Sequence, residues 1–144
     1  MKYFALVISF FFSFGLFAQD WKKTYAEALT HAKGEDKPII LVFSGSDWCA
    51  PCKKLERNIW QSEEFKSYAI ANYVLYNADF PRKKANKLPV EKAVVNKQLA
   101  AVYNPKGHFP LVVVLDRQEK ILGKASYEKV SPTKYIALLN SFIK

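Results

Sequence analysis

The chain has 144 residues, half of them hydrophobic, and a formal net charge of +9. This length suits one domain with a single core. The basic residues are scattered, with one denser run at residues 82–87. Scattered lysines are typical of a solvated surface, so the charge argues against a nucleic-acid-binding protein; a preference for acidic partners or an anionic membrane surface agrees with it.

The N-terminal segment has the pattern of a secretory signal peptide. Lys2 precedes an uncharged apolar stretch over residues 3–18 that ends in the small residue Ala18. The stretch is slightly short for a membrane span of about 20 residues. Leu16 is larger than the usual residue near a cleavage site, so an uncleaved anchor is the alternative. We therefore expect a signal peptide at 1–18, a domain at 19–144 and a periplasmic or secreted protein.

The expected domain begins with a helix, a strand and a second helix. Apolar residues recur at helical spacing over residues 21–32, and Gly34 follows as a helix-ending residue. Residues 39–44 form a continuous apolar run, which is typical of a strand buried on both faces. After a short turn, a new helix is expected to begin at Cys49 or Ala50.

The middle of the chain predicts a further helix, a strand, a loop and another helix. Ser62 precedes two glutamates, which is typical of a helix start. Residues 73–78 are the second strand, and the intervening helices make it a parallel neighbour of 39–44. The basic, proline-bounded residues 80–89 are a loop. The helix that follows is expected to bury Val95, Leu99, Val102 and Tyr103.

The last third predicts a β-hairpin and a closing helix. Residues 111–115 and 120–125 are strands with a short connection, so they should pair antiparallel. Ser131 caps a helix with Pro132 at its first position. Its buried stripe is expected to contain Tyr135, Leu138, Leu139 and Phe142. The elements together predict an α/β domain with a mixed four-stranded sheet flanked by helices.

Two cysteines, Cys49 and Cys52, are the only ones in the chain, and they have three potential uses. As a structural staple, a disulfide across so short a loop stabilises by only about 2 kcal/mol. Structural zinc needs about four ligands, and His31 and His108 are far apart in sequence. A redox centre agrees best with the local sequence.

The redox interpretation rests on the junction between a strand and a helix. Free N–H groups at a helix start favour a thiolate on Cys49. Cys52, one turn into the helix, is expected to be less exposed and placed to attack a mixed disulfide on Cys49. Trp48 either shields the pair and offers a flat apolar contact to a partner, or is a plain aromatic at the rim of the core.

These residues resemble the thioredoxin superfamily. WCAPCK at residues 48–53 is similar to the family's W-C-x-P-C-K motif, and HFPLVVVLD at 108–116 resembles its segment with a cis-proline. The resemblance implies a thioredoxin-like fold in which Cys49 attacks, Cys52 resolves and Pro110 faces the disulfide. It also implies that Trp48 and Phe109 line a groove for an extended substrate segment. The expected signal peptide makes the chain more similar to secreted or periplasmic members than to cytosolic thioredoxin.

Three positions depart from the thioredoxin pattern. Phe43 stands where thioredoxin has a buried aspartate that accepts a proton, Gly45 where it has a tryptophan, and Leu111 where it has a threonine. Lys54, Glu56 or water are the alternatives for deprotonating Cys52. The segment between the second strand and Pro110 is also longer than in thioredoxin.

The sequence therefore predicts a monomeric thiol–disulfide oxidoreductase of the cell envelope that needs no cofactor. The dipeptide Ala50-Pro51 resembles those of reducing members, so we expect it to reduce protein disulfides. A reductase in an oxidising compartment needs an electron donor, and we expect a membrane protein in that role. The alternative is a binding module for copper delivery or redox sensing, in which His108 joins the two cysteines as a soft-metal ligand or tunes the Cys49 thiolate.

Overall fold

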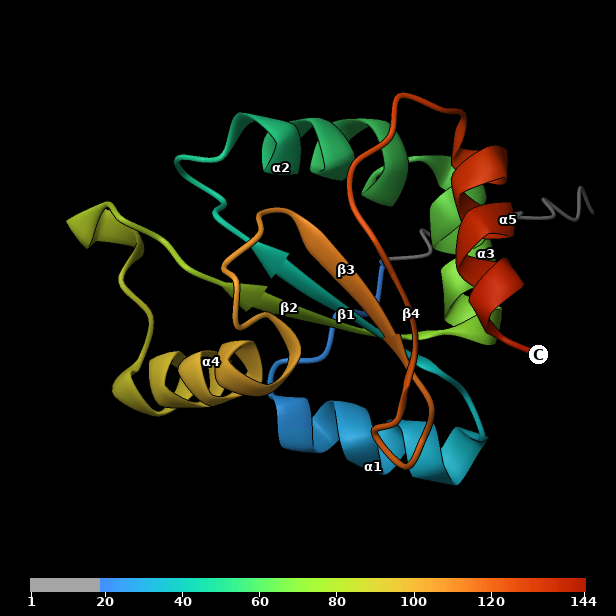
Figure 1. Ribbon diagram of the computed structural model, residues 1–144, viewed down its shortest axis with the longest axis horizontal. Helices are drawn as coiled ribbons and strands as arrows, with labels where there is room; N and C mark the ends of the chain where they lie inside the picture. The colour runs from blue at the N-terminus through green and yellow to red at the C-terminus, as the bar shows by residue number, and fades with distance from the viewer. Residues whose placement is uncertain (1–18) are drawn as a thin grey trace, which may run out of the picture.

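A computed structural model describes residues 19–144 and contains one four-stranded sheet (Figure 1). The signal peptide expected at 1–18 lies outside the described residues. The strands are β1 (Ile39–Ser44), β2 (Val74–Asp79), β3 (Leu111–Leu115) and β4 (Ile121–Ala125), in the order β2-β1-β3-β4. β1 runs parallel to β2 and antiparallel to β3, and β3 and β4 are antiparallel. The predicted mixed sheet is confirmed.

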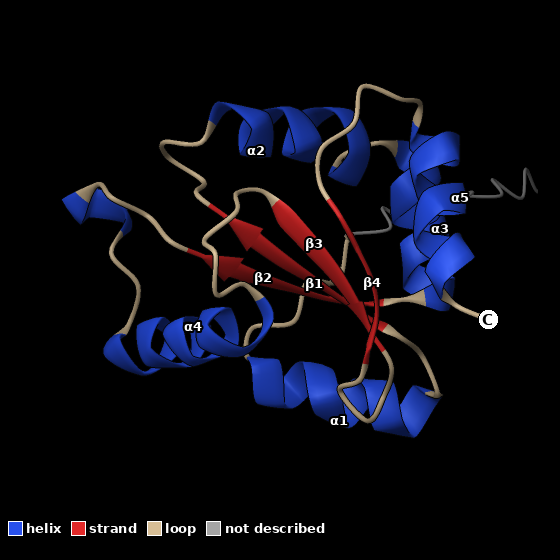
Figure 2. Cartoon of the chain, in the orientation of Figure 1, coloured by secondary structure: helices blue, strands red, loops and turns tan. Residues whose placement is uncertain are grey.

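Helices cover both faces of this sheet (Figure 2). One layer consists of α1 (Tyr25–Glu35) and α4 (Val90–Tyr103). The other consists of α2 (Ala50–Leu55), its π-helical continuation η1 (Glu56–Trp60), α3 (Glu63–Asn72) and α5 (Pro132–Phe142). Within residues 19–144, no helix has the length and apolar character that a bilayer span requires.

The side chains of β1 alternate between the two layers. Ile39, Leu41 and Phe43 belong to the core under α1 and α4, whereas Ile40 and Val42 belong to the core under the other layer. All of β1 is buried, as expected for a central strand with helices on both faces. The direction of Phe43 is therefore fixed, and it points away from the layer that contains α2.

Hydroxyl side chains cap the starts of α1, α3 and α5. Thr24, Ser62 and Ser131 each accept a hydrogen bond from the backbone N–H three residues on. The predicted starts at Ser62 and Ser131 are confirmed. The predicted start of the first helix is wrong, because Trp21 lies before the cap: its backbone bridges to Leu75 instead.

The end of α1 and one face of α4 also differ from the prediction. Gly34 lies inside α1, and the helix is capped after Glu35 by Asp36 in a left-handed conformation. Val102 is 67% exposed rather than buried. Asn96 takes the inward position instead, since its side chain accepts from the Tyr76 hydroxyl at 2.7 Å and donates to the Asp79 carbonyl at 3.1 Å.

Candidate functional site

The two cysteines lie at the start of α2, after the turn that follows β1, and they form a disulfide. Cys49 is the N-cap of α2: its Sγ accepts a hydrogen bond from the Cys52 N–H at 3.3 Å, and its own N–H donates to the Gly45 carbonyl at 2.9 Å. The predicted helix start is confirmed. The expected difference in exposure is wrong, because Cys49 is 4% and Cys52 5% exposed: the bond packs each sulfur against the other.

The residues predicted to contact substrate gather beside this disulfide. The Phe109–Pro110 peptide bond is cis, as the resemblance implied. The Phe109 ring packs edge-on against Trp48, with 5.4 Å between ring centroids. Pro110 lines a cavity together with Cys52 on one side and an open depression with Phe109 on the other. Trp48, Phe109 and Pro110 are thus neighbours of one another and of the cysteines.

Gly45 provides the space in which the Trp48 ring lies. A Cβ atom at position 45 would overlap the indole. The ring is held there by a hydrogen bond from its Nε1 to the Phe80 carbonyl at 2.7 Å. The glycine that departs from the thioredoxin pattern is therefore required by the position of Trp48 in this chain.

A cavity of about 300 Å³ lies behind Cys52. Its polar lining residues are Ser44, Ser46, Lys53, Glu56 and Asn77. Phe43 is absent from this lining because it faces the other layer, where it stacks on Phe80. Of the residues considered for deprotonating Cys52, Glu56 lines the cavity and Lys54 does not.

Asp47, which the sequence analysis missed, connects the cysteine turn to the loop after β2. Its carboxylate accepts hydrogen bonds from the backbone N–H groups of Arg82 and Lys83 and from the Asn86 amide, all at 3.0 Å. The Arg82 N–H, the Asn86 amide and the Lys83 N–H lower the pKa of Asp47 to about 2. The Arg82 guanidinium also lies 3.8 Å from the centroid of the Trp48 ring. An aspartate in a turn is a usual acceptor of backbone N–H bonds, but its partners are distant in sequence and gave no local signal.

The copper alternative requires at least three ligands that lie close together. Within the part of the chain that the structure describes, no group of three or more His, Cys, Asp or Glu side chains is placed to hold a metal. His108 is exposed, and its backbone exchanges two hydrogen bonds with the Asn104 side chain. Among the described residues, His108 is not part of such a group while Cys49 and Cys52 form a disulfide.

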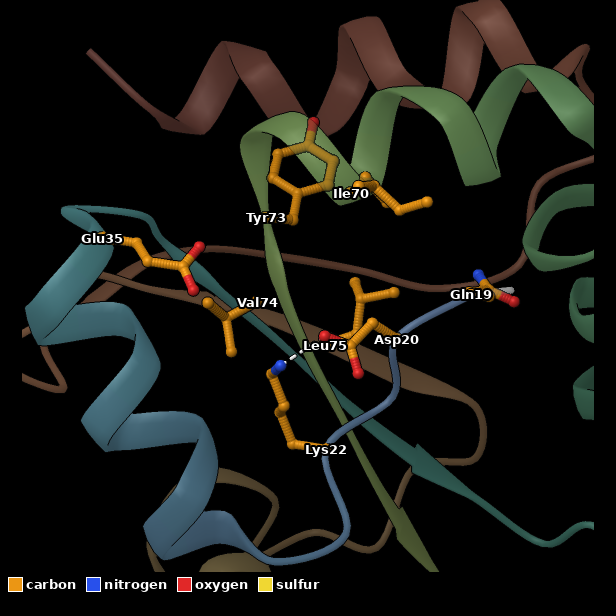
Figure 3. A pocket seen from close by; sticks show the side chains of 9 residues that line it. Gln19, Asp20, Lys22, Glu35, Ile70, Tyr73, Val74 and Leu75 are labelled. Carbon is orange, nitrogen blue, oxygen red and sulfur yellow. Dashed lines mark hydrogen bonds and ion pairs between the residues drawn. The ribbon is translucent and has the colours of Figure 1, made fainter. Parts of the chain in front are cut away.

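A second, smaller cavity of about 40 Å³ lies at the opposite end of the sheet (Figure 3). It is lined by Tyr73, Val74 and Leu75, at the start of β2, and by the segment before α1, where Lys22 pairs with Asp20. Because β1 and β2 are parallel, this end of the sheet is remote from the cysteine turn. The cavity is separate from the candidate site.

Comparisons with known proteins agree with this geometry. The thioredoxin-like family model matches residues 20–117. The disulfide bond reductase DsbH of Chlamydia pneumoniae is 39% identical over 122 residues, which cover 85% of this chain and 72% of that protein. A solved DsbH oxidoreductase has a TM-score of 0.80 at 38% identity, covering 86% of this chain and 83% of that chain. A thioredoxin from Thermus thermophilus shares the fold, with a TM-score of 0.64 at 14% identity over 86% of this chain and 87% of its own. The chain therefore belongs to the thioredoxin-like family.

Proposed function

We propose that this protein is a thiol–disulfide oxidoreductase of the cell envelope that reduces disulfides in other proteins. The observation that carries the proposal is the Cys49–Cys52 disulfide at the start of α2, beside the cis-proline Pro110. The similarity to a disulfide bond reductase over most of both chains supports the direction of electron flow.

Cys49 is the attacking residue in this proposal. Once the disulfide is reduced, the Cys52 N–H that points at the Cys49 Sγ, together with the helix start, stabilises a thiolate there. This thiolate attacks one sulfur of the substrate disulfide. A mixed disulfide forms between Cys49 and the substrate, and the other substrate sulfur leaves as a thiolate.

Cys52 is the resolving residue. It gives up its proton to a group in the cavity behind it, and its thiolate attacks the Cys49 sulfur. The mixed disulfide breaks, the second substrate sulfur leaves, and the Cys49–Cys52 disulfide forms. Two electrons have moved from the two cysteines to the substrate disulfide, and the two cysteine protons balance the two substrate thiolates. The structure corresponds to this oxidised state.

The substrate segment lies across Phe109 and Pro110 in this proposal. The open depression there has a volume of about 560 Å³ and is bordered by residues of β4, including Lys124 and Ala125. Trp48 is half-buried, so part of its ring remains available to the segment beside the reacting disulfide. The three residues thus orient the substrate sulfur toward Cys49.

The cycle requires a donor that returns two electrons to the oxidised cysteines. The periplasm and the outside of the cell lack the glutathione and thioredoxin that keep thiols reduced in the cytosol. The donor we propose is therefore a membrane protein with its own dithiol. The signal-peptide pattern supports this compartment. We further propose that the protein acts as a monomer.

A redox titration with variant proteins tests the proposal. We expect the Cys49–Cys52 couple, equilibrated with glutathione, to have a potential below about −180 mV, and a value well above this would contradict a reductase. Cys49→Ser should abolish insulin-disulfide reduction. Cys52→Ser is the matched control: it keeps the attacking sulfur and should accumulate a mixed disulfide with insulin that mass spectrometry detects. Full insulin reduction by Cys49→Ser would overturn the redox function.

A further inference from the structure

A concave surface of about 490 Å³, here called the basic groove, lies between the loop after β2 and α4. Its lining includes Val90, Ala93, Val94 and Lys97 from one face of α4, and Phe80, Pro81, Arg82, Lys83, Lys84, Lys87 and Leu88 from the loop. Val90 and Val94, one helical turn apart, are 68% and 47% exposed. The groove thus combines an apolar floor with cationic side chains.

The charge of the basic groove is strongly one-sided. Five of its lining side chains are cationic: Arg82, Lys83, Lys84, Lys87 and Lys97. None of the five makes an ion pair with a carboxylate of residues 19–144. Among residues 19–144, the one acidic residue in the lining is Asp79, and its carboxylate already accepts hydrogen bonds from the Ser46 N–H at 2.9 Å and the Ser46 hydroxyl at 2.6 Å.

Asp47 and Arg82 connect the basic groove to the disulfide site. Asp47, two residues before Cys49, accepts the three hydrogen bonds that hold the loop. Arg82 reaches from the groove lining over the Trp48 ring. The loop projects past the C-terminal ends of β1 and β2, which is also the end of the sheet where α2 begins (Figure 1). The basic groove therefore begins beside Trp48 and next to the cysteine turn.

We propose that the basic groove binds an acidic segment of the protein substrate, one that carries apolar side chains among its carboxylates and lies near the substrate disulfide. This inference rests on the proposed function and names a substrate class for it. Carboxylates pair with the free cations, and apolar side chains cover Val90 and Val94. Complementary charge of this kind mainly speeds association and selects partners.

Peptides with one common disulfide test this proposal. Each carries a three-residue spacer, which spans about 10 Å when extended, and then a tail of Asp-Glu-Leu-Asp-Glu-Val or its amide counterpart Asn-Gln-Leu-Asn-Gln-Val. The reduced full-length protein is mixed with each peptide, quenched with acid and analysed by chromatography. We expect the acidic tail to raise the second-order rate constant at least tenfold in 20 mM salt. The advantage should shrink strongly in 0.5 M salt because the Debye length falls to a few ångströms.

Two charge-reversal variants locate the effect. Lys87→Glu/Lys97→Glu changes the basic groove without touching Asp47, and it should remove the preference for the acidic tail. Lys33→Glu/Lys120→Glu is the matched control, because it changes the net charge equally at exposed sites outside the groove lining. The control should keep the preference. Both variants should reduce hydroxyethyl disulfide, a small neutral substrate, at the wild-type rate.

The outcomes separate this inference from the proposed function. A wild-type protein that reduces hydroxyethyl disulfide but reacts equally with both tails overturns the basic groove alone, and so does a control that loses the preference as fully as the groove variant. If wild type reduces no disulfide, the proposed function fails. In that case the groove is tested separately, by the fluorescence anisotropy of the labelled, cysteine-free acidic tail mixed with the oxidised protein. A rise in anisotropy supports the basic groove, and an unchanged anisotropy overturns it. Groove-dependent binding to vesicles of one part phosphatidylglycerol to three parts phosphatidylcholine, without any preference for the acidic tail, would identify a lipid surface instead and overturn the proposal.

Discussion

Gly45→Ala should displace Trp48 from its place over the turn before Cys49. The added Cβ would overlap the indole, so the ring has to move. In moving, it loses the hydrogen bond from its Nε1 to the Phe80 carbonyl, the edge-on contact with Phe109 and the position under the Arg82 guanidinium. The absence of a Cβ atom at position 45 thus makes room for three contacts of the site.

These contacts give the magnitude of the effect. A hydrogen bond of this kind contributes about 1 kcal/mol, an aromatic pair about 0.5–1.5 kcal/mol and an exposed cation–π contact about 0.5–1 kcal/mol. Alanine also restricts the unfolded chain, which offsets about 0.4–1 kcal/mol. The net loss in the free energy of unfolding should be about 2 kcal/mol. Because Trp48 moves away from Phe109, insulin-disulfide reduction should fall as well.

Urea unfolding and hydrogen exchange of the Trp48 indole N–H test this expectation. The indole proton should lose its protection, since its acceptor at Phe80 is no longer in reach. Gly34→Ala is the matched control: a Cβ there meets nothing within 4 Å, and alanine inside α1 should stabilise by about 0.5–1 kcal/mol. An unchanged unfolding free energy and a protected Trp48 indole in Gly45→Ala would refute the reasoning.

Three further substitutions test the surroundings of the disulfide. Asp47→Ala should abolish the protection of the Arg82 and Lys83 amides from hydrogen exchange at pH 5, and protected amides in this variant would show that Asp47 does not hold the loop. In the wild type, the pKa of Asp47 is lowered to about 2 from 3.8. The amides should therefore lose their protection only as the pH falls from about 4 through 2. Glu56→Gln should slow resolution of the Cys49 mixed disulfide by up to about 100-fold while the initial attack on hydroxyethyl disulfide keeps its rate; equal resolution rates would mean that water suffices. Phe43→Asp, which restores the thioredoxin residue, should cost about 3–5 kcal/mol in urea unfolding without speeding resolution, and faster resolution would show that position 43 reaches Cys52.

The sequence was sufficient for the order of elements and for the place of the cysteines. Continuous apolar runs mark β1 and β3 because a strand with helices on both faces needs apolar side chains on both sides. Ser62 and Ser131 mark helix starts because the hydroxyl satisfies a free N–H within three residues. Such signals are local, so they can be read without knowing the partner of each element.

The misplaced residues depend on partners far away in the chain. Trp21 has helical spacing with later residues, yet its backbone bridges to Leu75 and its ring packs edge-on against Trp60. Val102 is apolar and at an inward spacing, but the buried bonds of Asn96 to β2 set the rotation of α4. Tertiary contacts outweigh periodicity in both places, and one chain alone does not reveal them.

The site residues that are close in sequence were predicted, and a contact between residues distant in sequence was missed. Cys49, Cys52 and Trp48 are adjacent in sequence, and the cis-proline segment carries its own motif. The role of Asp47 was missed because its partners belong to a loop that looked like solvated charge. The composition of that loop does not reveal that Asp47 holds it against the cysteine turn.

Two departures from thioredoxin, the glycine at position 45 and the longer segment after β2, belong to one structural change. Gly45 leaves room for the Trp48 ring, and the segment after β2 supplies the carbonyl of Phe80 that accepts its N–H. The same segment places Arg82 over the ring and is itself held by Asp47. A larger residue at position 45 would displace the ring from the Phe80 carbonyl and from the Arg82 guanidinium together. The surface beside the disulfide is therefore built jointly by the cysteine turn and the basic loop, and a change in either should be felt by the other.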